Sequence, residues 1–312
     1  MFYYSCSRRY RLRTKKIERK FSFFQRLFRL LPEELLVIVT GATSGIGRVC
    51  AVELAKLGAK VIIGTRDQRR ADEISQAIQQ EALSGKVVGY HLDLSELSTV
   101  KVFADQVLHN ETRIDILLNN AGAAPGNHAL TTDGLEIHFG TNHLGHFYLT
   151  QLLLPLLIRS KARVVNVSSW ANYFVPKSGI DYNFPSSSYL RGITYGQSKL
   201  AQIWHSRELQ RRYGEQGLCA YSLHPGSINT EILREWPILL KISFQMIFYL
   251  FGKSSYRGAQ TSLYCALSDK AKPGEFHADC KPAKANSLAY NEKLAKECWD
   301  FSDEQIKKVT DL

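Results

Sequence analysis

Short apolar runs alternate with longer amphipathic stretches along most of the chain. The run at 35–40 is almost continuously apolar, which is typical of a strand that is buried on both faces of a sheet. The same kind of run predicts further strands at 60–65, 87–92, 114–118, 163–168, 218–223 and 275–278. Helical spacing of apolar residues predicts helices near 45–57, 67–82, 96–109, 131–158 and 194–213.

This alternation predicts the fold class. Strand–helix–strand units are right-handed and place one parallel sheet between two layers of helices. We therefore predict a single α/β domain over 34–312, a doubly wound (Rossmann) fold with about seven parallel strands. The polar and aromatic segment 172–192 is expected to be a loop.

The segment 228–256 departs from the pattern because its part 236–251 is mostly apolar. It is too short and too polar to span a bilayer. A core helix, a segment that dips into a membrane and an apolar lid over a substrate are the alternatives. Its place after the sixth strand favours the lid, because ligands of such sheets bind outside the carboxyl ends of the strands.

The positive charge of the chain is unevenly distributed. The formal net charge is +11, but residues 1–30 hold ten Lys or Arg and one acid, Glu18, so the rest carries only about +2. A basic arm over 1–33, rather than a basic domain, explains the excess, and we expect no nucleic-acid partner.

The apolar residues of the arm recur at helical spacing and form one stripe, made by Ile17, Phe21, Phe24, Phe28 and Leu31. A basic helix with aromatic residues on its apolar side is suited to an anionic membrane interface, here through residues 15–31. A mitochondrial transit peptide and a solvated arm that packs on the domain are the alternatives.

Cysteine and histidine spacing indicates no metal site. The six cysteines are scattered without a C-x-x-C motif, which argues against a zinc site or a dense disulfide framework and suits a reducing compartment. His143 and His146 have a metal-like spacing but no third ligand in view. A packing role or a role beside a cofactor is the better interpretation of this pair.

A glycine-rich turn over 40–47, TGATSGIG, follows the first predicted strand and opens a helix. Glycines let the backbone turn tightly and approach a pyrophosphate, whose charge the helix N-terminus stabilises. The turn predicts a dinucleotide site that involves Gly41, Ser44, Gly45, Ile46 and Gly47.

The end of the second predicted strand favours NADP(H) over NAD(H). An NAD site would place an acid here for the ribose 2′-hydroxyl, whereas an Arg accommodates a 2′-phosphate. Arg66 occupies the strand end and Asp67 comes after it, while Arg48 adds positive charge near the turn.

Tyr195 and Lys199 are four residues apart in a predicted helix, so they share one face of it. A nearby ammonium favours the phenolate and lowers the Tyr pKa from about 10. Tyr195 is therefore a candidate proton donor and acceptor.

Seven motifs in this order resemble the short-chain dehydrogenase/reductase family, and in particular its retinol dehydrogenase-like branch, over about residues 34–280. They are the turn 40–47, Asp93-Leu94, Asn119-Asn120-Ala121-Gly122, Asn142, Ser168-Ser169, Tyr195-x-x-x-Lys199, and His224-Pro225-Gly226 with Thr230.

The resemblance implies roles for four catalytic residues. Tyr195 would be the acid/base, and Lys199 would bind the nicotinamide ribose and lower the pKa of Tyr195. Asn142 would hold a water in a proton relay to Lys199. Ser169 would hydrogen-bond the substrate oxygen, and Ser168 is disfavoured because strand alternation aims the two side chains oppositely.

The resemblance also implies cofactor contacts. Asp93, followed by Leu94, would lie at the adenine, and Asn120, Ala121 and Gly122 would line the cofactor. The carboxamide end would be surrounded by Pro225, Gly226 and Thr230. Trp170 departs from the family pattern, where a smaller residue usually follows the serine, and it changes the expected pocket shape.

The implied function is an NADP(H)-dependent oxidoreductase that interconverts a lipophilic alcohol and its carbonyl, such as a retinoid or steroid. The expected location is the cytosolic face of the endoplasmic reticulum or a lipid droplet, with the mitochondrion as the alternative. Family members commonly form homo-oligomers.

Two other functions compete with this one. The first is a soluble or mitochondrial carbonyl reductase of small substrates. The second is a nucleotide-bound scaffold without turnover, against which the intact set of catalytic residues argues.

Overall fold

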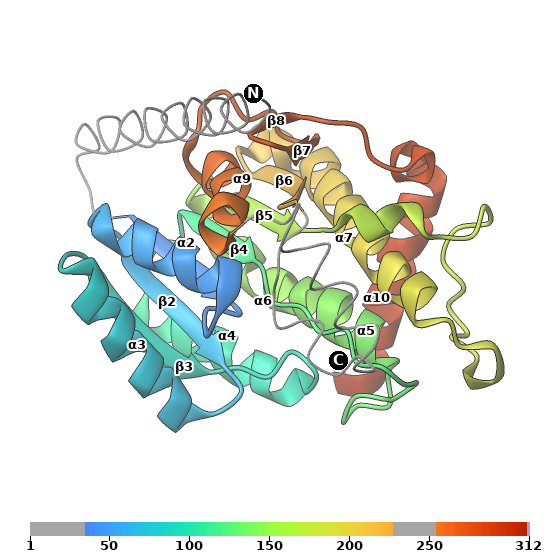
Figure 1. The fold of residues 1–312 in the computed structure, drawn as a ribbon, viewed down its shortest axis with the longest axis horizontal. Coiled ribbons are helices and arrows are strands. Elements are labelled where there is room, and N and C mark those ends of the chain that lie inside the picture. Colours follow the sequence, from blue (N-terminus) through green and yellow to red (C-terminus); the bar gives the residue numbers. More distant parts are fainter. Residues whose placement is uncertain (1–34, 227–253, 311–312) are drawn as a thin grey trace, which may run out of the picture. The chain divides into compact units, whose positions relative to one another are not determined.

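A mostly parallel sheet forms the centre of the computed structural model, which describes residues 35–226 and 254–310 (Figure 1). Its spatial order is β3-β2-β1-β4-β5-β6-β7-β8, and only β8 is antiparallel to its neighbour. The strands are β1 (Leu36–Thr40), β2 (Lys60–Thr65), β3 (Lys86–His91), β4 (Ile116–Asn119), β5 (Arg163–Val167), β6 (Cys219–His224), β7 (Phe276–Ala278) and β8 (Lys281–Pro282). The predicted doubly wound fold is confirmed, with one added strand.

The added strand β8 follows from a tight hairpin. Asp279 and Cys280 both have left-handed backbone angles, with φ of 51° and 57°. Two consecutive left-handed residues make the turn whose twist matches antiparallel strands. Neither residue is Gly or Asn, so the sequence carries no strong signal for this turn.

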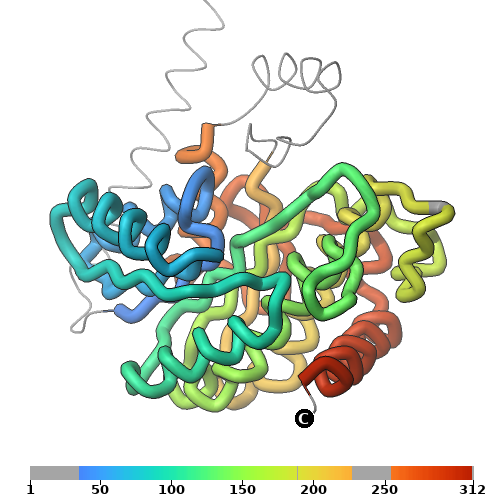
Figure 2. Tube along the Cα trace, turned by 90° about the horizontal axis from the view of Figure 1, so that it is seen from below, coloured from blue at the N-terminus to red at the C-terminus, as the bar shows by residue number. Residues whose placement is uncertain are grey.

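Helices cover both faces of the sheet (Figures 1 and 2). One layer contains α2 (Gly45–Lys56), α3 (Gln68–Ala82) and α9 (Ser255–Leu267), and the other contains α4 (Leu97–Asn110), α6 (Gly145–Arg159) and α7 (Arg191–Tyr213). The helix α10 (Glu292–Thr310) packs on α7 and α4. Short helical turns are α5 (Ile137–Phe139), η1 (Gly140–Leu144), η2 (Trp170–Tyr173), η3 (Ser186–Ser188), η4 (Gly214–Gln216) and η6 (Ser287–Tyr290).

The predicted helix 131–158 is wrong in two respects. The chain first makes a tight turn, in which Gly134 has a φ of 76° and Leu130 pairs with Glu136, so the helix begins only at Ile137. The segment Gly140–Leu144 is then a π-helical turn between α5 and α6. Such an inserted turn is often found at functional sites, and here it carries Asn142.

The apolar strands explain why the sheet is buried on both faces. Every residue of β1 and β4 is buried, as expected for central parallel strands that helices cover on both sides. Phe103, Phe147 and Trp204 belong to the apolar cluster that also includes Trp299 of α10. This cluster holds the C-terminal helix on the layer that carries the Tyr195–Lys199 pair.

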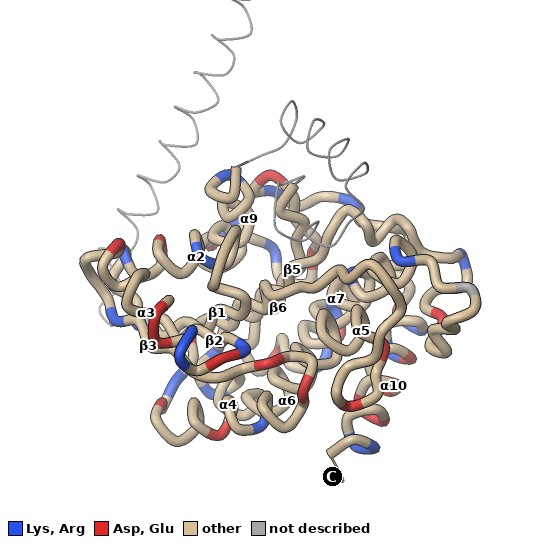
Figure 3. The backbone as a smooth tube through the Cα atoms, turned by 60° about the horizontal axis from the view of Figure 1, so that its bottom comes forward, with Lys and Arg blue, Asp and Glu red and all other residues tan. Residues whose placement is uncertain are grey.

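Acidic and basic residues are interspersed on the outer helices (Figure 3). On α10 they pair four residues apart, as in Lys307–Asp303 at 2.8 Å and Lys308–Glu304 at 2.7 Å. Such exposed pairs contribute little to stability. Within the described residues, no helix combines the length and the apolar character that crossing a membrane requires.

Several predictions lie outside the described residues. These are the arm 1–33 with its stripe, Thr230, and the predicted lid as far as residue 253. The lid was predicted to run to 256, but α9 already begins at Ser255.

Candidate active site

The glycine-rich turn has the geometry that a close backbone approach requires. Gly41 and Gly45 have positive φ of 68° and 58°. A Cβ on Gly47 would lie 2.2 Å from the Gly41 carbonyl oxygen and 2.4 Å from Asn120 Nδ2, so no larger residue fits there. The turn lies where β1 and β4 are neighbours and the strand order reverses, which is where doubly wound folds bind ligands.

The N-terminus of α2 is available to an anion. Ser44 is the N-cap residue, yet its side chain makes no capping hydrogen bond. Its hydroxyl and the first backbone N–H groups, from Gly45, Ile46 and Gly47, are thus the type of donor set that binds phosphate. The residues of the turn fit a dinucleotide.

A hydrogen-bond brace connects the turn with the end of β4. Thr40 Oγ1 accepts the backbone N–H groups of Asn120 at 2.9 Å and Ala121 at 3.0 Å. Asn120 Nδ2 donates to the carbonyl oxygens of Thr40 at 2.9 Å and Gly41 at 3.3 Å. Asn120, predicted to line the cofactor, therefore also fixes the turn.

The predicted adenine end follows β3. Asp93 uses Oδ1 to accept the Ser95 N–H at 2.9 Å and the Ser95 hydroxyl at 2.6 Å. Leu94 is buried, and its carbonyl oxygen would be 2.4 Å from a Cβ on Gly145. Leu94 thus contributes packing against the start of α6.

The three charged residues near the end of β2 differ in their surroundings. Arg66 is exposed at the carboxyl end of the strand. Asp67 is engaged as the N-cap of α3, where its side chain accepts the Arg70 N–H at 2.8 Å. Arg48 pairs with Glu81 at 2.8 Å, so the positive charge predicted there is partly compensated.

Tyr195, Lys199 and Ser169 meet beside the carboxyl end of β5. Lys199 Nζ lies 5.6 Å from the centroid of the Tyr195 ring and donates to the Val167 carbonyl oxygen at 3.1 Å. The Ser169 hydroxyl lies close enough to Tyr195 to lower the pKa of the phenol. Ser168 points away, and its hydroxyl donates to the Lys199 carbonyl oxygen at 2.6 Å.

Burial is the main cause of the pKa shifts of the Tyr195 phenol and the Lys199 ammonium. It raises the pKa of Tyr195 to about 12, against a smaller lowering by the Ser169 hydrogen bond. Burial also lowers the pKa of the Lys199 ammonium to about 8. The prediction that the pKa of Tyr195 lies below its usual value is therefore wrong for this structure, because loss of hydration at the phenol outweighs the lowering by Ser169.

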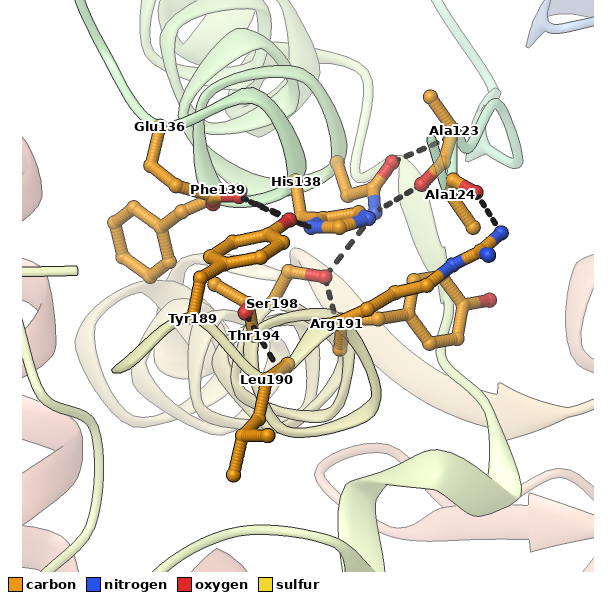
Figure 4. Close-up of polar contacts among 12 residues, drawn as sticks. Ala123, Ala124, Glu136, His138, Phe139, Tyr189, Leu190, Arg191, Thr194 and Ser198 are labelled. Atoms are coloured by element: carbon orange, nitrogen blue, oxygen red, sulfur yellow. Dashed lines mark hydrogen bonds and ion pairs between the residues drawn. The ribbon is translucent and has the colours of Figure 1, made fainter. Parts of the chain in front are cut away.

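Asn142 joins three elements through its side chain. Oδ1 accepts the Ala123 N–H at 2.7 Å, and Nδ2 donates to the Ala123 carbonyl oxygen at 2.9 Å and to Ser198 Oγ at 3.1 Å (Figure 4). Its own carbonyl oxygen accepts from His146 Nδ1 at 2.9 Å and from Gln202 Nε2. These contacts tie η1 to α7 and to the segment after β4.

Gly122 has no side chain to fill the space beside Lys199 and Asn142. A Cβ on Gly122 would lie 3.2 Å from Lys199 Nζ and 3.6 Å from Asn142 Oδ1. The predicted cofactor-lining glycine thus borders the predicted catalytic amine. Pro225 and Gly226 follow β6, and Gly226 has a φ of 96°.

The two histidines set aside as metal ligands have separate partners. His143 Nε2 lies 2.8 Å from Ser302 Oγ of α10. His146 Nε2 lies 2.8 Å from Thr40 Oγ1, which belongs to the brace of the glycine-rich turn. Among residues 35–226 and 254–310, no cluster of three His, Cys, Asp or Glu side chains could hold a metal ion.

Sequence reasoning missed Glu136, His138, Tyr189 and Gln202, all of which lie in or near this site. The rings of His138 and Tyr195 pack edge to face, with their centroids 6.0 Å apart. Gln202 follows Lys199 by three residues, so helical spacing was the one signal that could have found it.

Comparison with known proteins identifies the family of the chain. A family model described as short chain dehydrogenase matches residues 35–238. The chain is 40% identical to retinol dehydrogenase 12 of Mus musculus over 274 residues, which cover 87% of this chain and 86% of the relative. It is 39% identical to retinol dehydrogenase 14 of Mus musculus over 285 residues, which cover 86% and 85%.

Solved structures give the same result. An uncharacterized protein from Mycobacterium Paratuberculosis superposes with a TM-score of 0.70 at 34% identity, covering 90% of this chain and 97% of that one. A short-chain dehydrogenase from Sphingobium yanoikuyae in complex with NADPH has a TM-score of 0.56 at 22% identity, covering 73% and 82%, and supports the fold.

The chain therefore belongs to the short-chain dehydrogenase family and to its retinol dehydrogenase-like branch. It is an oxidoreductase of a family that binds a nicotinamide dinucleotide and interconverts alcohols and carbonyls.

Proposed function

We propose that the protein is an NADP(H)-dependent oxidoreductase that interconverts a lipophilic alcohol and its carbonyl, with Tyr195 as the acid/base. The observation that carries the proposal is the meeting of the Ser169 and Tyr195 hydroxyl groups, with Lys199 beside them, at the carboxyl end of β5. A binding protein would not require two converging hydroxyl groups and a buried amine at this position.

The residues of the chain supply binding and a proton, while a bound nicotinamide supplies hydride transfer. In carbonyl reduction, Ser169 and Tyr195 hold the substrate oxygen, and Tyr195 donates its phenolic proton as negative charge develops there. Lys199 stabilises the phenolate that remains. Alcohol oxidation follows the same contacts in reverse, with Tyr195 as the base.

The β2 end supports NADP(H) over NAD(H). The carboxylate that could bind a ribose 2′-hydroxyl is Asp67, and this group is already engaged in capping α3. Exposed Arg66 is left as the charged side chain at the strand end. We expect the Arg66→Ala variant to raise the KM for NADPH and to leave the KM for NADH unchanged.

The names of the relatives support a lipophilic substrate, because both are retinol dehydrogenases. We include in the proposal an apolar lid over 228–253 and contact with a membrane surface through 15–31 and 236–251. The corresponding location is the cytosolic face of the endoplasmic reticulum or a lipid droplet, and homo-oligomers are part of the proposal.

Turnover of a defined substrate set tests the proposal. The full chain is assayed with NADPH and NADH against retinal, a steroid ketone and small aldehydes, with and without liposomes. We expect the highest kcat/KM for NADPH with retinal or the steroid ketone. Equal kcat/KM for NADPH and NADH, or turnover of small aldehydes alone, would contradict the cofactor or the substrate assignment, respectively.

A further inference from the structure

A buried polar cluster lies between α5 and the start of α7 (Figure 4). It lies next to the Tyr195 ring. Glu136 and His138 come from the start of α5 and are 5% and 0% exposed. Tyr189 comes from the segment that leads into α7. Together these residues form what we term the Glu136–His138–Tyr189 triad.

All three members of the triad contact one another. Glu136 Oε1 lies 3.0 Å from His138 Nδ1 and 3.3 Å from the Tyr189 hydroxyl, and that hydroxyl lies 2.8 Å from His138 Nδ1. The other carboxylate oxygen of Glu136 accepts the Phe139 N–H at 2.7 Å. The carboxylate is therefore bound firmly at the beginning of α5.

Donor and acceptor chemistry assigns the protons of the triad. An ionised carboxylate only accepts, so the Tyr189 hydroxyl donates to Glu136. The proton on His138 Nδ1 then points to the Glu136 carboxylate and the Tyr189 oxygen. His138 Nε2 is buried without a hydrogen-bond partner among the described residues. The polar contacts that restrain the imidazole thus run through the triad.

The imidazole that the triad holds supports the Tyr195 ring. The two ring centroids are 6.0 Å apart at an interplanar angle of 75°, an edge-to-face arrangement. Lys199 Nζ lies 5.6 Å from the same Tyr195 ring. The phenol ring is therefore in contact with a histidine as well as with the lysine.

Two further contacts hold the same stretch of α7 (Figure 4). Ser198 Oγ, which accepts from Asn142, donates to the Tyr195 carbonyl oxygen at 2.7 Å. Arg191, one turn before Tyr195, donates from Nη2 to the Ala124 carbonyl oxygen at 2.6 Å. These contacts fix the backbone of the helix, whereas the triad reaches the ring itself.

We propose that Glu136, His138 and Tyr189 are positioning residues for proton transfer by Tyr195, and that Tyr189 couples the segment 172–190 to that transfer. The inference rests on the proposed function, since it concerns the same acid/base. A buried carboxylate is costly to desolvate, and apolar residues of similar volume would hold two helices together without that cost. The directional contacts of the triad instead fix the orientation of the imidazole.

The Tyr189→Phe variant of the full chain tests the proposal, because it removes one hydroxyl and keeps the ring. We expect kcat for carbonyl reduction to fall about tenfold, since small displacements of a reacting group are costly. The KM for NADPH should remain at its wild-type value, because the triad touches neither the glycine-rich turn nor β2. The Tm should fall slightly, because the buried Glu136 carboxylate loses one hydrogen-bond donor.

The matched control is Tyr182→Phe. Tyr182 belongs to the same segment, and its variant also loses a hydroxyl. That hydroxyl lies beside the Cys298 thiol of α10, and the ring centroids of Tyr182 and Phe301 are 4.2 Å apart. We expect wild-type kcat for this variant. An equal loss of kcat in both variants would overturn the proposal, as it would indicate a general effect of the segment.

A pair of His138 variants separates positioning from packing. His138→Gln keeps an N–H donor for Glu136 but loses the ring beside Tyr195, so it should retain more of kcat than His138→Leu, which keeps volume alone. His138→Leu should lose at least as much kcat as Tyr189→Phe. Wild-type kcat in both Tyr189→Phe and His138→Leu would overturn the inference and leave the proposed function intact. A wild-type chain without turnover would overturn the proposed function itself.

Discussion

At the scale of single residues, burial has a larger effect on the pKa values of Tyr195 and Lys199 than their distance from each other. Lys199 was expected to lower the pKa of Tyr195, yet burial disfavours the charged form of both side chains. The pKa of Tyr195 rises to about 12, which keeps the phenol protonated at neutral pH. Under the proposed function, Tyr195 of the free protein would therefore carry the proton that carbonyl reduction needs.

The Tyr195→Phe variant removes the proton donor and keeps the ring. We expect kcat for reduction to fall by about 10²- to 10⁴-fold, the usual contribution of a positioned acid. The dissociation constant for NADPH, measured by fluorescence titration, should remain unchanged. Wild-type turnover by this variant would end the acid/base assignment.

The pH dependence of reduction should follow Lys199. Tyr195 keeps its proton up to pH about 12, but the Lys199 ammonium loses its charge as pH rises through its pKa of about 8. We expect kcat/KM for reduction to be flat below pH 8 and to decline above it, because kcat/KM reports the free enzyme. Lys199→Arg keeps a permanent charge, so its lower activity should not decline in that range.

The buried Lys199 ammonium should also lower the free energy of unfolding of the protein. Its folded pKa lies below the value of 10.5 for an unperturbed lysine, so the folded state binds fewer protons than the unfolded state between pH 8 and 10.5. Stability therefore rises with pH through that window, and the full cost of about 3 kcal/mol is present below pH 8. Lys199→Met should be inactive and have a higher Tm at pH 7. An unchanged or lower Tm would contradict this.

At the scale of elements, the apolar runs predicted the strands well because central parallel strands are buried on both faces. The two rearrangements near Asn142 could not be predicted from periodicity. The turn at Gly134 and the π-helical turn depend on contacts with distant residues, such as Ala123 and Ser198. The Glu136–His138–Tyr189 triad was invisible for the same reason, since 51 residues separate His138 from Tyr189.

A substitution that adds one methyl group tests whether the glycine-rich turn requires glycine at position 47. In Gly47→Ala the new Cβ would meet the Gly41 carbonyl oxygen and Asn120 Nδ2. We expect about 1–3 kcal/mol lower stability, the usual cost of overpacking, and at least tenfold weaker NADPH binding by titration. Gly192→Ala is the matched control, because no heavy atom of the described residues, apart from its chain neighbours and its own helix backbone, would lie within 4 Å of the new Cβ, and alanine favours a helix. Equal NADPH affinity in the two variants would contradict the predicted role of the turn.

At the scale of the whole molecule, the sequence predicted one doubly wound sheet, and the chain has it. The helices α9 and α10 were not predicted. The helix α10 is rich in charged residues. It packs on α7, and its few buried residues include Cys298 and Trp299, which belong to the apolar cluster. Its role in closing the core therefore emerges only from the packed structure.

Membrane contact is the remaining prediction at this scale, and it depends on the uneven charge of the chain. Residues 1–30 carry nearly all of the excess positive charge, beside an apolar stripe that contains Phe21, Phe24 and Phe28. Attraction to anionic lipid and burial of the stripe should act together, so the full chain should sediment with vesicles that contain an anionic phospholipid. Deletion of residues 1–31 should abolish this binding, and replacing the three phenylalanines with serine should weaken it while the charge stays constant. If the deletion variant sediments as before, the contact must come from another segment, for which the apolar stretch 236–251 is the candidate.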